Sequence, residues 1–143
     1  MNEDTKQLLK ECDSGCKMAV ESIEQLLEYV KDHKLKDILN KYKNKHEEIR
    51  VKAEEQLKQQ GEDGKEPSLS AEAFSWISTK IKMTMYDDDR KLAEILMDGC
   101  NMGIRSICRV QNKQKEASKD SVSLAENLVR TEEELQKELK AYL

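Results

Sequence analysis

The sequence predicts an all-α protein, a four-helix bundle made of two helical hairpins, and three observations support this prediction. Charged residues make up 38% of the 143-residue chain and aromatics only 4%, with one proline and five glycines, which is typical of a mostly helical protein. Apolar residues recur at steps of three and four, and one nine-residue motif occurs twice. We expect one domain over 1–143, with hairpins at 5–60 and 89–142 joined by a crossover at 61–88.

The first hairpin is predicted from two uninterrupted apolar seams. A helix over 5–31 is expected to begin at a cap formed by Asp4 or Thr5, and a helix over 33–60 follows a short turn capped by Asp32. The seam of the first helix consists of Leu9, Cys12, Cys16, Ala19, Ile23, Leu26 and Val30. The seam of the second consists of Leu35, Leu39, Tyr42, His46, Ile49, Ala53 and Leu57. Both faces are expected to point into the bundle.

The middle of the chain predicts a linker, a short crossover helix and the start of the second hairpin. "QQGEDGKEPS" at 59–68 holds the only proline and is expected to be an exposed linker, followed by a short helix over 70–85. In "YDDD" at 86–89, consecutive aspartates do not share a helix face, so helix capping is favoured over metal binding.

The second hairpin is expected to consist of helices over 89–114 and 119–142, the latter capped by Ser118 or Asp120. The inward positions of the first are Leu92, Leu96, Cys100, Gly103, Ile107 and Val110. Those of the second are Leu124, Leu128, Leu135 and Leu139.

The repeated motif reads "GCKMAVESI" at 15–23 and "GCNMGIRSI" at 99–107. It aligns Cys16 with Cys100 and Ala19 with Gly103, all on inward seams. Two hairpins related by a pseudo-two-fold axis would bring these positions together at the centre. Small residues would let the two helices approach closely, and Met18 and Met102 would fill neighbouring gaps.

The chain resembles the ferritin-like superfamily, in particular its small bacterial four-helix bundles. The resemblance lies in "LLKECDSGCKMAVESI", the turn "KDHKLKDIL", the crossover "EAFSWISTKIK" and "DDDRKLAEILMDGCNMGIRSICRV". It implies an up-down bundle with one crossover, internal pseudo-two-fold symmetry and, in the better-known relatives, a di-iron or di-manganese carboxylate site.

That di-metal site requires one Glu on each of two helices and a Glu-x-x-His pair on each of the other two. The sequence has only two histidines. His33 falls in the turn, and His46 is preceded three residues earlier by Lys43. The inward positions of the first and third long helices hold Cys12, Cys16 and Cys100 in place of carboxylates. We therefore expect the usual di-iron ligands to be missing, and we assign no catalytic residues.

The inward thiols leave a second interpretation open. Cys12, Cys16 and Cys100 together with His46 form a set that Zn²⁺ or another soft metal accepts, and a Cys16–Cys100 disulfide is also conceivable. Against this, buried cysteines commonly serve as small apolar residues, and for His46 we favour a core or boundary histidine over a metal ligand. We favour packing and expect no cofactor, while a metal site on these four residues remains the alternative.

Net charge and hydropathy limit the kinds of partner and the cellular location that we expect for this protein. The net charge of −4 arises from 25 basic and 29 acidic residues that are mixed along the chain, which argues against nucleic-acid binding. Apolar runs are too short for a membrane span, and the polar N-terminus is unlike a secretory signal. We expect a cytoplasmic bundle that is not an enzyme and acts through binding or self-assembly, with a homo-oligomer, most simply a dimer, as partner. The alternative is a thiol-based metal-binding or redox protein.

Overall fold

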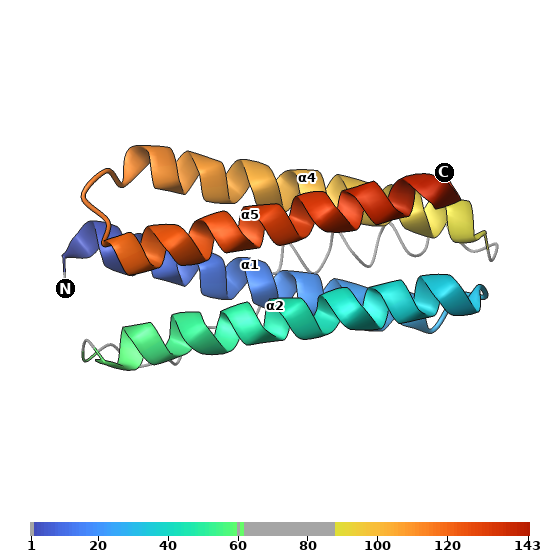
Figure 1. The fold of residues 1–143 in the computed structure, drawn as a ribbon, viewed down its shortest axis with the longest axis horizontal. Coiled ribbons are helices and arrows are strands. Elements are labelled where there is room, and N and C mark those ends of the chain that lie inside the picture. Colours follow the sequence, from blue (N-terminus) through green and yellow to red (C-terminus); the bar gives the residue numbers. More distant parts are fainter. Residues whose placement is uncertain (1, 60, 62–87) are drawn as a thin grey trace.

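The computed structural model describes residues 2–59, 61 and 88–143. These residues form four α-helices and a terminal 3₁₀ turn, and they contain no strand (Figure 1). The elements are α1 (Glu3–Leu27), α2 (His33–Gln59), α4 (Asp89–Lys113), α5 (Lys119–Leu139) and η1 (Lys140–Tyr142). The all-α prediction is confirmed, and none of the described helices is long and apolar enough to span a membrane. The short helix expected over 70–85 lies outside the described residues.

The helices lie side by side as a bundle of two antiparallel hairpins (Figure 1). α1 packs against α2 and α4, and α5 packs against α4 and α2. α2 and α4 run in the same direction, so that α2 ends and α4 begins at opposite ends of the bundle. The core therefore runs between four helices along the whole length of the bundle.

The side chains that cap the helices agree with the prediction for α2 and α5 but differ from it for α1. α1 begins at Glu3 because the side chain of Asn2 accepts a hydrogen bond from the Thr5 amide at 2.8 Å, so the prediction that Asp4 or Thr5 caps this helix is wrong. The predicted caps at Asp32 and Ser118 are confirmed, since Asp32 accepts from the Leu35 amide and Ser118 from the Ser121 amide.

The aspartate run before α4 has a capping function, as predicted. Asp88 is the N-cap of α4, and its side chain accepts a hydrogen bond from the Arg90 amide at 2.9 Å. Asp89, in the first turn of α4, reaches across to the other hairpin. Its two carboxylate oxygens accept hydrogen bonds from the backbone amides of Lys31 and Asp32, at 3.0 and 2.9 Å, in the turn between α1 and α2.

An analogous contact joins the hairpins at the opposite end of the bundle. Asp4, in the first turn of α1, accepts a hydrogen bond from the Glu116 amide at 2.9 Å, and Thr5 accepts one from the Ser118 amide at 2.9 Å. Glu116 and Ser118 belong to the connection between α4 and α5. The first turn of each hairpin thus caps the turn of the other hairpin, which fixes how the two hairpins are aligned along the bundle.

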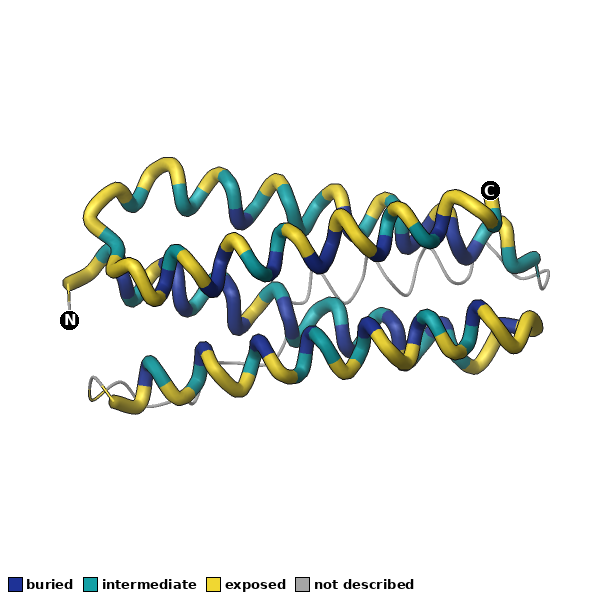
Figure 2. Tube along the Cα trace, in the orientation of Figure 1, coloured by how far each residue is buried: buried dark blue, intermediate teal, exposed yellow. Residues whose placement is uncertain are grey.

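The predicted seams account for most of the core (Figure 2). Every predicted inward residue of α2 is buried. Ala19, Gly103 and Val110 were predicted to point inward but are only half-buried. On α5 the predicted leucines are buried, but Thr131 and Glu132 are buried as well, and the sequence analysis did not place either of them in the core.

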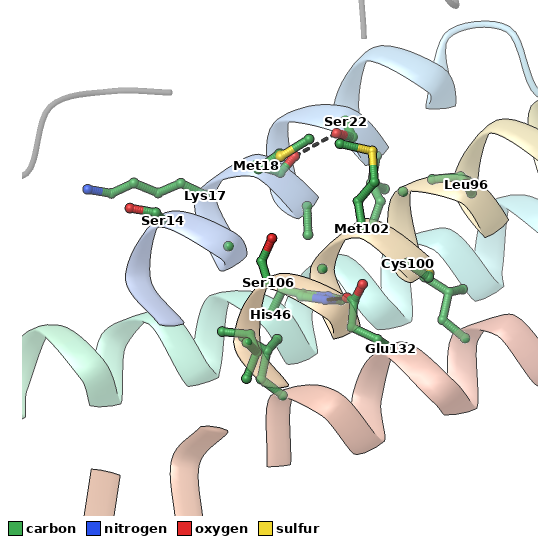
Figure 3. A pocket seen from close by; sticks show the side chains of 18 of the residues that line it. Ser14, Lys17, Met18, Ser22, His46, Leu96, Cys100, Met102, Ser106 and Glu132 are labelled. Carbon is green, nitrogen blue, oxygen red and sulfur yellow. Dashed lines mark hydrogen bonds and ion pairs between the residues drawn. The ribbon is translucent and has the colours of Figure 1, made fainter. Parts of the chain in front are cut away.

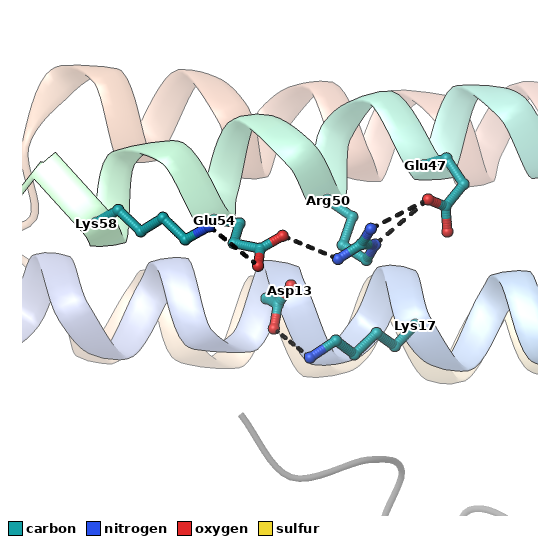
Figure 4. Close-up of polar contacts among 6 residues, drawn as sticks. All are labelled: Asp13, Lys17, Glu47, Arg50, Glu54 and Lys58. Carbon is teal, nitrogen blue, oxygen red and sulfur yellow. Dashed lines mark hydrogen bonds and ion pairs between the residues drawn. The ribbon is translucent and has the colours of Figure 1, made fainter. Parts of the chain in front are cut away.

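A line of charged side chains covers one edge of the interface between α1 and α2 (Figure 4). Arg50 contacts Glu47 at 3.3 Å and Glu54 at 3.0 Å on its own helix, and across the interface Asp13 is buried and pairs with Lys17 at 2.9 Å. The pKa of Arg50 is raised, first by its hydrogen bond with Glu47 and also by the negative charge of Asp13. This attraction between helices adds a polar contribution to an otherwise apolar interface.

We predict that Asp89→Ala destabilises the protein more than Asp120→Ala does. Both residues lie in the first turn of a helix and share its favourable dipole interaction, but only Asp89 accepts two backbone hydrogen bonds from the other hairpin. We expect a loss of about 1–2 kcal/mol beyond that of the control, because two amides lose a charged acceptor. Urea unfolding of both variants measures the difference, and equal losses would contradict the role of Asp89.

Candidate functional site

The predicted site residues are buried at the centre of the bundle. Cys12, Cys16 and His46 are fully buried, and Cys100 is 3% exposed. Cysteines 12, 16, 100 and 108 are all free, so the Cys16–Cys100 disulfide that the sequence allowed is not formed. Cys12 and Cys16 belong to one apolar cluster and Cys100 to another. The shared neighbour of Cys16 and Cys100 is Glu132, whose negative charge acts on both thiols.

The most unusual feature of this centre is a buried pair formed by His46 of α2 and Glu132 of α5. His46 is completely buried and Glu132 is 6% exposed. His46 Nδ1 lies 2.6 Å from the carbonyl oxygen of Tyr42, and Nε2 is hydrogen-bonded to Glu132 Oε1. Both ring nitrogens therefore have oxygen partners, and the imidazole orientation is fixed from two sides.

These partners determine how many protons the pair carries. A carbonyl oxygen only accepts hydrogen bonds, so Nδ1 of His46 must carry a proton, and the bond between Nε2 and Glu132 contains a second. Burial lowers the pKa of His46, but the hydrogen bond and charge of Glu132 and the Tyr42 carbonyl outweigh it and raise the pKa. The raised pKa of His46 favours the imidazolium form, and with two protons the pair has no net charge whether the second proton lies on the imidazole or on the carboxylate.

The surrounding thiols are held in their neutral form. Burial, reinforced by the charges of Glu11 and Asp13, raises the pKa of Cys12 to about 12. Burial and neighbouring negative charges also raise the pKa of Cys16, and burial together with Glu132 raises that of Cys100. Because the thiolate is the nucleophile and the metal ligand, these cysteines have little reactivity in the folded protein.

Gly103 of α4 makes room for the carboxylate of Glu132. A Cβ atom at position 103 would lie 2.9 Å from Glu132 Oε2, closer than side-chain carbons ordinarily approach. The repeated motif predicts that this glycine lets two helices approach closely. The structure gives a different reason, since the atom that a Cβ would meet belongs to a buried acid. At Gly15 of α1 a Cβ would only make an ordinary contact, 3.7 Å from Leu128 Cδ2.

A pocket of about 400 Å³ lies between α1 and α4 and reaches this centre (Figure 3). The side chains of His46, Cys100 and Glu132 line its deep part, together with apolar side chains such as Leu128. Towards the surface it is lined by half-buried residues of the repeated motif. These are Gly15, Met18 and Ala19 on α1 and Gly99, Met102 and Gly103 on α4. The repeat therefore forms the two walls of a pocket.

Sequence reasoning missed Glu132 and so wrongly expected a centre without acids. A signal was present, because the predicted inward positions 124, 128, 135 and 139 of α5 leave a gap of six residues between Leu128 and Leu135. Helical spacing fills that gap with Thr131 and Glu132, which are both buried. The gap was overlooked because "TEEELQK" has the composition of an exposed helix face.

The geometry gives little support to the alternative interpretation, a metal site on Cys12, Cys16, Cys100 and His46. Within residues 2–59, 61 and 88–143, no three His, Cys, Asp or Glu side chains are arranged to hold one ion. His46 uses both ring nitrogens in hydrogen bonds, and the thiols are protonated. Zinc binding at this centre would require the displacement of these protons and the reorientation of the imidazole.

Comparison of the chain with protein-family models, with curated proteins and with solved structures gave no significant match.

We predict that Gly15→Ala and Gly103→Ala differ in their effect on stability although they make the same change in neighbouring helices. Alanine favours a helix over glycine by about 0.5–1 kcal/mol, and Gly15→Ala should gain this amount because its Cβ has room. The free energy of unfolding of Gly103→Ala should be about 1–3 kcal/mol lower than that of Gly15→Ala, because the new methyl group displaces Glu132 from His46. Urea unfolding provides the measurement, and equal stabilisation would show that Glu132 does not depend on Gly103.

Proposed function

We propose that this protein binds a small, mostly apolar molecule in the pocket between α1 and α4 and that it is a binding protein without catalytic activity. The observation that carries the proposal is the pocket itself, which combines about 400 Å³ of volume with a buried His46–Glu132 pair on its wall. Small-molecule sites have volumes in this range and join an apolar lining to a few fixed polar groups.

The walls suit a ligand whose shape is not strictly matched. Gly15 and Gly99 contribute no side chain, and Met18 and Met102 contribute flexible thioethers from opposite helices. Methionine adapts to ligands of different outline and makes favourable contacts with aromatic rings. The repeated motif thus supplies the same kind of adaptable wall on both sides of the pocket.

The chemistry of the pocket wall supports binding over catalysis. Cys100 lines the pocket, and burial together with Glu132 raises its pKa, which makes it a poor nucleophile. His46 has no ring nitrogen left to act as a base. A thiol-based redox or metal-binding function, the alternative from the sequence, finds less support in this arrangement.

The proposal also includes the ferritin-like assignment, the pseudo-two-fold symmetry, self-assembly into a dimer and a cytoplasmic location. The parallel course of α2 and α4 supports the first of these, because bundles with a single crossover have this arrangement. The repeated motif on facing walls supports the second.

The test uses N-phenylnaphthylamine, an uncharged dye whose fluorescence rises in apolar surroundings. We expect saturable binding by the 143-residue chain, and Ala19→Leu should weaken it on the order of tenfold, equivalent to about 1.4 kcal/mol, because the larger side chain fills the pocket that Ala19 lines. Fluorescence titration gives both affinities, and circular dichroism verifies that the variant is folded.

The matched control is Ala141→Leu, the same change at an exposed residue of η1, which should bind the dye as the unmodified protein does. Absence of saturable binding to the unmodified protein, or an unchanged affinity in Ala19→Leu, would overturn the proposed function.

A further inference from the structure

We infer that the ligand of this pocket is an uncharged molecule whose inner end carries a hydrogen-bond donor, such as a hydroxyl or N–H group, that bonds to Glu132. The inference rests on the proposed function and names the class of ligand for the same site. It follows from two properties of the pocket wall, namely the charge balance of the buried pair and the kind of hydrogen-bonding group that the pair leaves available.

The charge balance argues against a charged inner end. The imidazolium of His46 and the carboxylate of Glu132 both line the pocket, and their charges cancel. Among the described residues that line the pocket, the charged side chains nearer the surface are those of Glu11 and Lys17, and Lys17 is paired with Asp13 at 2.9 Å. A net charge placed beside the buried pair would lose its hydration without gaining a counter-charge, which is costly in an apolar site.

The hydrogen bonds of the pair determine the polarity of the ligand group. His46 donates from Nδ1 to the Tyr42 carbonyl and shares the proton on Nε2 with Glu132 Oε1, so it has no donor to offer a ligand. The other oxygen of Glu132, Oε2, faces Gly103, where a Cβ would lie 2.9 Å away. A carboxylate oxygen accepts more than one hydrogen bond, so the buried pair offers the ligand an acceptor and not a donor.

Because Gly103 has no side chain, a ligand in the pocket can reach Oε2 of Glu132. Gly103 and Glu132 both line the pocket, and Figure 3 shows the Glu132 carboxylate beside His46 at the inner end, with the labelled side chains of Met18 and Met102 farther out. The thiol of Cys100 also interacts with Glu132, but a neutral thiol is a weak donor. A ligand hydroxyl would form the stronger bond to the same carboxylate.

The experiment compares four ligands that share a naphthalene ring, each in competition with N-phenylnaphthylamine on the 143-residue chain. Naphthol carries a donor, its methyl ether carries none, naphthoate is an anion and naphthylmethylammonium is a cation. We expect naphthol to bind about tenfold more tightly than the methyl ether, and both charged compounds to bind more weakly than naphthol. Glu132→Gln should reduce the advantage of naphthol over its ether to less than about threefold.

The outcomes separate this inference from the proposed function. Binding of the dye together with equal affinities for naphthol and its ether would leave the pocket in place and overturn the inference, as would tighter binding of either charged compound. A protein that binds none of the compounds would refute the proposed function itself. The comparison of naphthol with its ether is made on the unmodified protein, so it gives a result even if Glu132→Gln does not fold.

Discussion

The structure depends on the hydrogen bond between His46 and Glu132, because it joins two ionisable side chains that are both buried in the core. A buried acid or a buried imidazolium alone would be strongly destabilising. Together they satisfy each other, and the Tyr42 carbonyl occupies the remaining ring nitrogen. The pair joins α2 to α5, one helix from each hairpin, and so specifies which helix faces meet.

The buried pair explains why the repeated motif has small residues at several positions. Gly103 leaves the space that Glu132 occupies, and Cys16 and Cys100 place neutral, compact side chains near its charge. A larger or charged residue at these positions would displace the carboxylate or compete for its proton. The same absence of bulk on α1 and α4 leaves the pocket open down to the pair, so that a requirement of packing also creates a potential binding site.

The helices and most of the core could be predicted from the sequence because apolar spacing reports directly which side of a helix is buried, as it did along all of α2. The contacts that align the hairpins could not. Asp89 and Asp4 lie in first turns of helices, where any acid is favourable. Nothing in the local sequence indicates that their carboxylates accept hydrogen bonds from the other hairpin. Of the candidate site, His46 and the cysteines were found from their inward spacing, whereas Glu132 was hidden in an acidic tract that resembles a solvated face. Glu132 can be buried because it pairs with His46 of α2, which lies 86 positions away in the chain.

The most direct test of this account is the protonation state of His46, observed through the nitrogen chemical shifts of its ring by NMR, with His46→Gln assigning the signal. Because the pKa of His46 is raised above its ordinary value of 6.5, the ring should keep both protons at pH values just above 6.5. The pair's contribution to stability should be complete below that pH and be lost as the pH rises through the raised value. A ring that already has one nitrogen free of a proton at pH 6.5 or below would contradict the claim that a charged pair lies at the centre of the bundle.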